Sequence, residues 1–263
     1  MITLTYWDLL ASSLLVLILA AVSAYAKLGI TRTLLIAAIR CAVQLGLIGL
    51  ILNWLFGTES LAVLLLVVTV MWVAAGREVV GRQSRRLKGL YAFASGAVAM
   101  FLSSFTVTIV ALTLIIDVQP WYQPQYAIPL LGMMLGNTMT GVSLATERLT
   151  TSVWERAAQI EQRLMLGQTA REAMRPLMRE SATAGIMPIV NAMSAAGLVS
   201  LPGMMTGQIL AGTPPTEAVK YQLMIMFLVS AGTGLGVVGS LWVTQMRLFD
   251  SRQRLRLDRL SSS

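Results

Sequence analysis

The sequence contains no histidine, one cysteine and few charged residues, and each shortage narrows what the protein can be. Histidine is the commonest general base and metal ligand near neutral pH, so most hydrolytic and metal-centre enzymes are disfavoured. Cys41 has no second cysteine with which it could form an intrachain disulfide. Asp, Glu, Lys and Arg make up only 12% of the residues, about half of the share in a soluble domain. A soluble enzyme is therefore a poor fit to this composition.

The Gly-x4-Gly-Lys-Ser/Thr phosphate loop, which holds nucleotide phosphates in ordinary ATPases, is absent from the sequence. Gly234, Gly236 and Gly239 match a dinucleotide-binding pattern, but they lie inside an apolar run and follow no predicted strand. We interpret these glycines as positions where membrane helices approach each other closely. The chain is therefore predicted to be no enzyme and to carry no cofactor of its own.

Long apolar runs are what the sequence does have, with 56% hydrophobic residues and a mean hydropathy of +0.72. A helix crosses the hydrocarbon core with roughly 20 apolar residues. No basic residue precedes the first run, so we interpret it as a retained helix rather than a signal peptide. The predicted fold is all-α: one domain over residues 1–263, a polytopic membrane protein of about seven transmembrane helices. The runs lie near 6–26, 34–55, 60–76, 90–116, 126–146, 183–201 and 219–246.

Basic residues are distributed unevenly along these runs and loops. Eighteen of the 20 Lys and Arg residues fall in the first, third and fifth loops or in the tail, which share one side of a seven-span chain. The opposite loops carry mainly Glu59, Asp117 and Glu217. Because cytoplasmic loops are enriched in Lys and Arg, the N-terminus is predicted outside and the C-terminus in the cytoplasm. The net charge of +8 then reflects orientation in a membrane and indicates no nucleic-acid partner.

One substantial soluble segment, residues 147–182, follows the fifth run. Ser152 with Glu155, and Thr169 with Glu172, have the spacing of a capping box, which starts a helix. We therefore expect a cytoplasmic insertion of two amphipathic helices, which either lie on the membrane surface or dock to a cytoplasmic partner. The residues predicted to contact such a partner are Arg156, Ile160, Arg163 and Leu164.

The basic tail, residues 247–263, carries Leu255, Leu257 and Leu260 among its arginines. Clusters of basic residues beside a membrane helix bind anionic lipid headgroups. We expect this tail to lie against the lipid surface.

Polar residues within the apolar runs are candidates for a transport pathway, because they are costly in hydrocarbon. Arg40 and Gln44 lie one helical turn apart in the second run, where Arg40 either snorkels to the headgroups or lines a pathway. In the fifth run, Asn137 and Thr140 are expected to face protein or a cavity, next to Met133. Methionine sulfur suits soft metals but is also ordinary apolar filler, so metal ligands stay unassigned.

Small residues recur three to five positions apart in the fifth and last runs. This spacing is typical of membrane helices whose backbones approach closely. The residues predicted to pack in this way are Gly132, Gly136, Gly141, Gly232 and Gly236.

Three stretches carry a family resemblance: IRCAVQLGLIG (39–49), GMMLGNTMTGVSLATERL (132–149) and VNAMSAAGLVSLPGMMTGQILAG (190–212). They resemble the permease family of FetB (YbbM) type, and the similarity runs in order over essentially the whole chain. The resemblance implies the membrane subunit of an ABC transporter in the bacterial inner membrane, working with a separate ATPase subunit. Bacterial members are assigned to iron export and protection from peroxide stress, and plant relatives are linked to aluminium tolerance.

A single seven-span chain also suggests a homodimer around a shared pathway. The residues SLPG (200–203) resemble the end of an ATPase-coupling loop, which would place them in the cytoplasm, whereas the span count places them outside. A broken or re-entrant segment over 183–212 is an alternative to a full span there. The alternative functions are a membrane scaffold or receptor that transports nothing, an ion channel, and a permease for a non-metal substrate.

Overall fold

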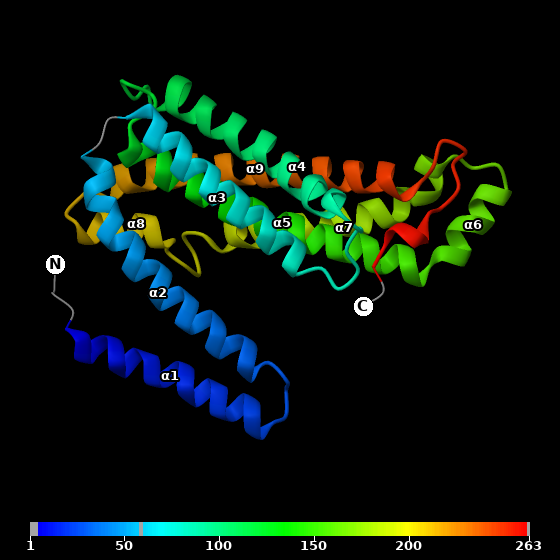
Figure 1. The fold of residues 1–263 in the computed structure, drawn as a ribbon. Helices are drawn as coiled ribbons and strands as arrows, with labels where there is room; N and C mark the ends of the chain where they lie inside the picture. Colours follow the sequence, from blue (N-terminus) through cyan, green and yellow to red (C-terminus); the bar gives the residue numbers. More distant parts are fainter. Residues whose placement is uncertain (1–4, 58–59, 262–263) are drawn as a thin grey trace. The chain divides into compact units, whose positions relative to one another are not determined.

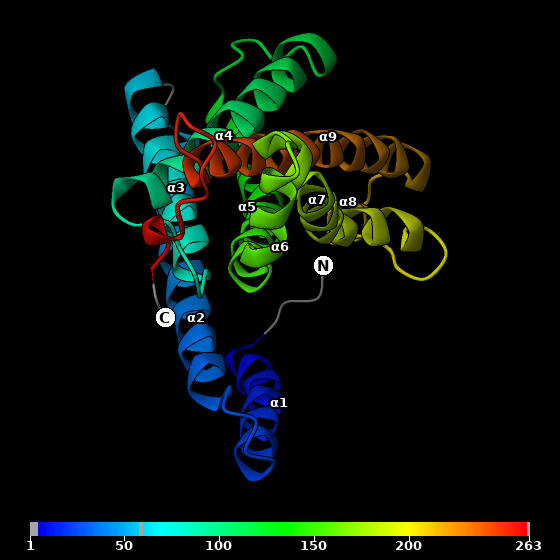
Figure 2. The same ribbon diagram turned by 90° about the vertical axis from the view of Figure 1, so that its right-hand side faces the viewer.

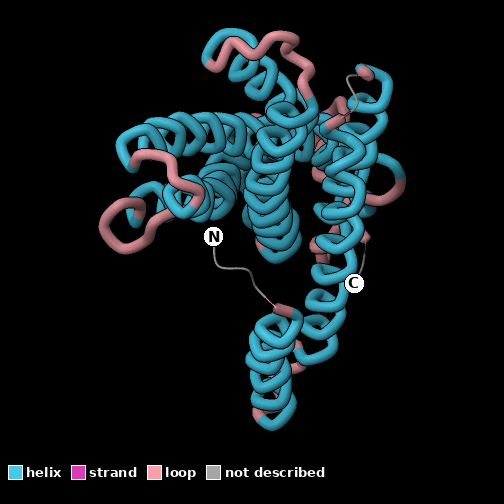
Figure 3. Tube along the Cα trace, turned by 90° about the vertical axis from the view of Figure 1, so that its left-hand side faces the viewer, coloured by secondary structure: helices cyan, strands magenta, loops and turns pink. Residues whose placement is uncertain are grey.

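The computed structural model describes residues 5–57 and 60–261, which form helices joined by loops (Figure 1). No strand occurs in these residues, and only three isolated bridges pair backbone segments (Figure 3). The chain divides into two compact units, Met1–Glu59 and Ser60–Ser263. The predicted all-α fold class is confirmed.

The first unit is a hairpin of two apolar helices, α1 (Tyr6–Tyr25) and α2 (Thr31–Phe56). Across the turn between them, the Thr31 hydroxyl donates a hydrogen bond to Ser23 Oγ (3.0 Å). Most described side chains of both helices are exposed. Such surfaces fit lipid or another protein, because an apolar helix is unstable in water.

The second unit is built around the long helix α5, which packs against α3, α4, α7 and α9. Its buried core follows α5 and α9 toward the end where α6 lies, which faces the viewer in Figure 2. The elements of this unit are α3 (Leu61–Gly81), α4 (Leu90–Val110), the π-helical turn η1 (Ala111–Ile115), α5 (Pro124–Glu155), α6 (Ala157–Met165), α7 (Ala170–Ala195), α8 (Gly203–Leu210), α9 (Pro215–Leu248) and the 3-10 turn η2 (Leu257–Arg259).

Glycines lie at close helix contacts of the second unit. A Cβ atom added to Gly141 of α5 would lie 2.9 Å from the carbonyl oxygen of Gly185 on α7. Gly232 and Gly236 of α9 lie equally close to side chains of α5. Because a side chain at these positions would collide with a neighbour, glycine is what lets α5, α7 and α9 approach each other.

Six described helices are long and apolar enough to cross a membrane, and they match six of the seven predicted spans: Trp7–Tyr25, Thr31–Phe56, Leu61–Gly81, Gly96–Ile115, Pro124–Glu155 and Pro215–Leu248. The seventh, predicted over 183–201, is not a continuous helix. α7 ends at Ala195, residues 196–202 are irregular, and α8 begins at Gly203. Gly197 takes a left-handed conformation (φ 83°) and Pro202 lacks an N–H donor, so the helix does not continue through them.

The insertion at 147–182 also differs from expectation. α5 continues through Ser152, which is buried, so Ser152 does not start a helix. Thr169 does start one, as predicted, because its backbone N–H and its hydroxyl both donate to Glu172 (2.8 Å each). That helix, α7, continues without interruption into the predicted sixth span. The insertion is therefore largely the extension of two long helices, with the short α6 between them.

The basic tail folds back onto the protein as residues 249–261, which we call the strap. Leu260 is buried and forms a bridge with Leu87 in the loop between α3 and α4. Leu255 and Leu257 are partly buried against the core. The leucines of the tail thus contact protein, which corrects the expectation that they lie against lipid.

Candidate functional site

One face of α5 carries the polar residues predicted for a pathway, and this face is uncovered. Asn137 is exposed and Met133 and Thr140 are half-buried, whereas Leu135 and Thr138 between them are buried. The Asn137 amide donates to the carbonyl of Met133 (2.8 Å), and the Thr140 hydroxyl donates to a carbonyl one turn earlier (3.1 Å). Both hydrogen bonds stay within α5, so neither side chain is used to hold another described helix.

A second polar face lies on α7. α5 and α7 run antiparallel (Figure 1) and meet where Gly141 faces Gly185. Asn137 and Asn191 lie on the same side of this crossing, about 6 and 9 Å from it along their helices. Asn191 and Ser194 are both exposed. The second unit therefore presents polar side chains from two neighbouring helices at a similar depth.

The other pathway candidates, Arg40 and Gln44, lie one turn apart on α2 in the first unit, and both are exposed. They belong to a different unit from the α5 residues and stay a separate prediction. No group of three or more His, Cys, Asp or Glu side chains that could hold a metal occurs in the described part of the chain.

The five glycines predicted to pack are placed differently by the structure. Three of them, Gly141, Gly232 and Gly236, lie in close helix contacts, whereas a Cβ atom on Gly132 would meet Met71 at 3.3 Å and one on Gly136 would meet nothing within 4 Å. Gly136 lies on the same uncovered face as Asn137. Gly185 was not among the predicted residues, although the small residues around it (SATAG, 181–185) have the same character.

Three basic segments meet at one end of the second unit, which we call the basic end: the α3–α4 loop, the region around α6, and the strap. The backbone N–H of Ser84 in the loop donates to Glu147 of α5 (2.8 Å). The backbone N–H of Ala170 at the start of α7 donates to Gln253 of the strap (2.8 Å). Together with the bridge at Leu260, these contacts join the segments into one surface.

Two carboxylates at the basic end, Glu172 and Asp258, have a pKa below the ordinary value. Hydrogen bonds from the Thr169 backbone and hydroxyl lower the pKa of Glu172, and the guanidinium of Arg256 lowers the pKa of Asp258 to about 2. A carboxyl whose pKa is lowered by folding stabilises the folded state above its ordinary pKa, about 4, and this contribution is lost as the pH falls through the folded value. The hydrogen bonds of Glu172 and Asp258 are thus complete at neutral pH.

The predicted docking residues on and next to α6 differ in burial and in their partners. Ile160 is 1% exposed and packs in the core, and Leu164 is half-buried against it. Arg156 pairs with Glu180 of α7 (3.1 Å), and Arg163 is also half-buried. A cytoplasmic partner therefore has no access to Ile160, whose role is to fix α6 to the core.

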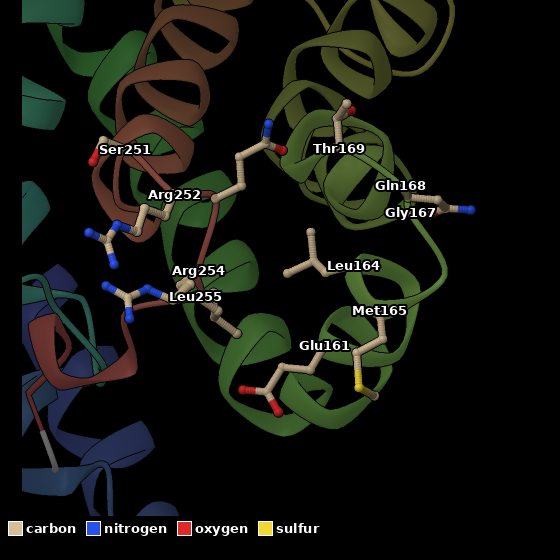
Figure 4. A pocket seen from close by; sticks show the side chains of 11 residues that line it. Glu161, Leu164, Met165, Gly167, Gln168, Thr169, Ser251, Arg252, Arg254 and Leu255 are labelled. Atoms are coloured by element: carbon tan, nitrogen blue, oxygen red, sulfur yellow. The ribbon is translucent and has the colours of Figure 1, made fainter.

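Met165, the last residue of α6, and Leu166, which follows it, are apolar and exposed, at 79% and 82%. Next to this turn, a groove of about 850 Å³ separates α6 and the start of α7 from the strap (Figure 4). Leu164 lines its α6 side, and Arg252 and Arg254 line its strap side. The basic end thus offers an apolar tip beside a basic groove, which the 3.6-residue periodicity used for α6 did not reveal.

Comparison with known proteins identifies the family. The model of the family described as "Uncharacterised protein family (UPF0014)" matches residues 6–249. The chain belongs to the UPF0014 family of membrane proteins. Its match covers α1 to α9 and stops where the strap begins.

Three UPF0014 relatives align along most of the chain. A membrane protein of Synechocystis is 36% identical over 230 residues, 87% of both chains. YjkA of Bacillus subtilis is 32% identical over 255 residues, 95% of this chain and 98% of its own. FetB of Escherichia coli K12, named "Probable iron export permease protein", is 30% identical over 247 residues, 94% of this chain and 93% of its own. No solved structure matches the chain.

Proposed function

We propose that this UPF0014 protein is the permease subunit of an ABC transporter that exports a metal cation, iron above all, across the bacterial inner membrane. The name of FetB supports the transport and the substrate. The missing phosphate loop supports a separate ATPase subunit as the source of energy. The apolar helices supply the membrane-spanning part.

The observation that carries the proposal is the exposed apolar tip at Met165 and Leu166 beside the basic groove. Apolar side chains exposed together outside the apolar spans mark a protein interaction site. α6 is fixed to the core by Ile160, and the helices on either side of it, α5 and α7, continue into the bundle. A partner that changes shape with bound nucleotide moves these helices only through contacts that differ between its states. We propose that Met165 and Leu166 make such a contact with the ATPase subunit.

A second copy of the chain is proposed to cover the polar face of α5. Asn137 and Thr140 are costly against hydrocarbon, and Gly136 leaves room for a close helix on the same face. Two such faces in a homodimer would enclose a shared pathway lined by Asn137, Thr140 and Met133. Each copy would carry one ATPase subunit at its basic end.

The first prediction tests the docking tip. Replacing Met165 and Leu166 together by Asp places two charges where an apolar contact is proposed, so co-purification of the ATPase should fall at least about tenfold, the effect of losing a strong hot spot. The measurement is the amount of ATPase retained on the tagged permease, followed by its ATP hydrolysis. Gln162→Asp, exposed on the same helix, adds a charge without removing an apolar contact and should retain the ATPase.

Two outcomes would contradict the proposal. Full retention of the ATPase by the Met165→Asp, Leu166→Asp variant would place docking elsewhere. In inverted membrane vesicles, ATP should drive uptake of Fe²⁺ by the complex, and the absence of ATP-dependent uptake of any divalent cation would exclude metal export. Equal expression of the two variants would show that a loss of the ATPase comes from lost docking and not from misfolding.

A further inference from the structure

The irregular segment 196–202 between α7 and α8 lies halfway along a membrane helix. The Ser230 hydroxyl of α9 donates to the sulfur of Met193, two residues before the end of α7 (3.1 Å). Ser230 is fifteen residues after Pro215 and eighteen before Leu248, the two ends of α9. α8 then packs against the remaining half of α9. α7 and α8 are thus two halves of one span, interrupted near the middle of the bilayer.

The backbone of this segment has hydrogen-bonding groups that the protein does not satisfy. Among the described residues, the carbonyl oxygens of Ala196, Gly197, Leu198 and Val199 accept no hydrogen bond, and the N–H groups of Leu198 and Leu201 donate none. Each such group is costly to place in hydrocarbon. The segment therefore does not face lipid, since irregular backbone at membrane depth occurs only against protein or water.

The side chains around the segment are of two kinds, and none carries a charge. Leu198, Val199 and Leu201 are apolar and exposed. Asn191, Ser194 and Ser200 are exposed, and no Asp, Glu, Lys or Arg occurs from 181 to 216. Asn137 on α5 lies near the depth of Asn191, which is on the α7 side of the segment. Ser194 donates to the carbonyl of Val190 (2.9 Å), but an apolar protein surface would leave the Asn191 amide, the Ser200 hydroxyl and the backbone carbonyls of the segment unpaired, whereas water pairs them.

We propose that residues 196–202 line a water-filled section of the transport pathway at the middle of the membrane. The solute that it takes is a hydrated divalent cation, which exchanges part of its water for carbonyl, hydroxyl and amide oxygens as it passes. Interrupted spans of this kind line the solute sites of transporters, and backbone carbonyls there coordinate cations. The identity of the solute rests on the proposed function, whereas the presence of water rests on the backbone alone.

Cysteine labelling tests this inference on the full chain in its membrane. Since Cys41 is the only cysteine, Cys41→Ser gives a background without thiols. Ala196→Cys and Ser200→Cys then place a thiol in the segment, and Phe227→Cys and Leu235→Cys place one on the exposed face of α9 within five residues of Ser230. A thiol reacts as its thiolate, which forms only in water, so a charged methanethiosulfonate reagent should label the segment at least about tenfold faster than α9.

The outcomes separate this inference from the proposed function. Slow labelling at all four positions, with full labelling after denaturation, would show that protein or lipid covers the segment and would overturn the inference. Fast labelling at the α9 positions would overturn it as well, because α9 would then not lie in lipid. Mn²⁺ should slow the labelling of Ser200→Cys and sulfate should not. Equal slowing by both ions would refute the proposal that the solute is a cation. None of these measurements requires the ATPase, so a failure of docking leaves them intact.

Discussion

Gly236 and Gly136 belong to the same kind of small-residue pattern, yet their surroundings are opposite. A Cβ atom on Gly236 would lie 2.9 Å from the Ser103 hydroxyl and closer still to Thr138, whereas one on Gly136 would meet nothing within 4 Å. At the first position, glycine is required by its neighbours. At the second, it is required by nothing within the described chain.

This difference makes a prediction for two matched variants. Gly236→Ala should destabilise the permease by about 1–3 kcal/mol, because α4 and α5 have to move away from α9 to admit the methyl group. Gly136→Ala should stabilise the free chain by up to about 1 kcal/mol, because alanine is the better helix former. Thermal unfolding of the two purified variants in detergent measures both effects. A Gly236→Ala protein as stable as the parent would show that the close approach of α9 and α5 is not real.

Spacing in the sequence predicts that these glycines share helix faces, but it does not say what each face meets. The contact of Gly236 with α4 and the exposure of Gly136 depend on how distant helices cross. The same limit applies to Ile160 in α6 and to Leu166 just after it, since one is buried and the other exposed. Periodicity finds an apolar stripe, whereas only the packed structure tells which part of it the core uses.

The strap is the element that holds the basic end together. Leu260 is 2% exposed and pairs with Leu87, and Arg259 donates to the carbonyl of Arg247 at the end of α9 (2.7 Å). The family match ends at residue 249, the first residue of the strap. The strap thus acts on the loops that the helices present.

Leu260→Asp should release the strap, because a buried carboxylate without a partner is strongly destabilising. We expect limited proteolysis to cut between 249 and 261 much faster in this variant, while the helices stay intact. Ser251→Asp adds the same carboxylate at an exposed position of the strap and should leave the digestion pattern unchanged. Identical digestion of both variants would mean that Leu260 does not anchor the strap.

At the level of elements, the sequence predicts the long apolar helices well and the interrupted span poorly. Six spans are read directly from hydropathy, and the Thr169–Glu172 capping box correctly marks the start of α7. Residues 183–201 are apolar on average despite Asn191, Ser194 and Ser200, so hydropathy leaves both a full span and the broken segment open, and the structure shows that the chain unwinds after Ala195. The strap was missed for a related reason, since its leucines resemble those of a lipid-binding tail until their partners on the α3–α4 loop are known.

For the whole molecule, the structure gathers three basic segments at one end of the second unit, and the positive-inside rule makes this end cytoplasmic. The prediction is that a C-terminal reporter active only in the cytoplasm is active when fused after Ser263. A reporter inserted between Gly212 and Pro214, at the opposite end of α9, should be active only in the periplasm. The reverse pattern would overturn the orientation, and with it the placement of the docking tip.

The interruption at 196–202 also has a consequence for how the protein is made. An insertion machinery that reads each emerging segment for hydrophobicity would accept residues 183–201 as a span, because about 20 apolar residues suffice. The unwound backbone at 196–202 is tolerated at membrane depth only beside protein or water. The interruption should therefore form only after α9, whose Ser230 contacts Met193, has been synthesised and lies beside α7.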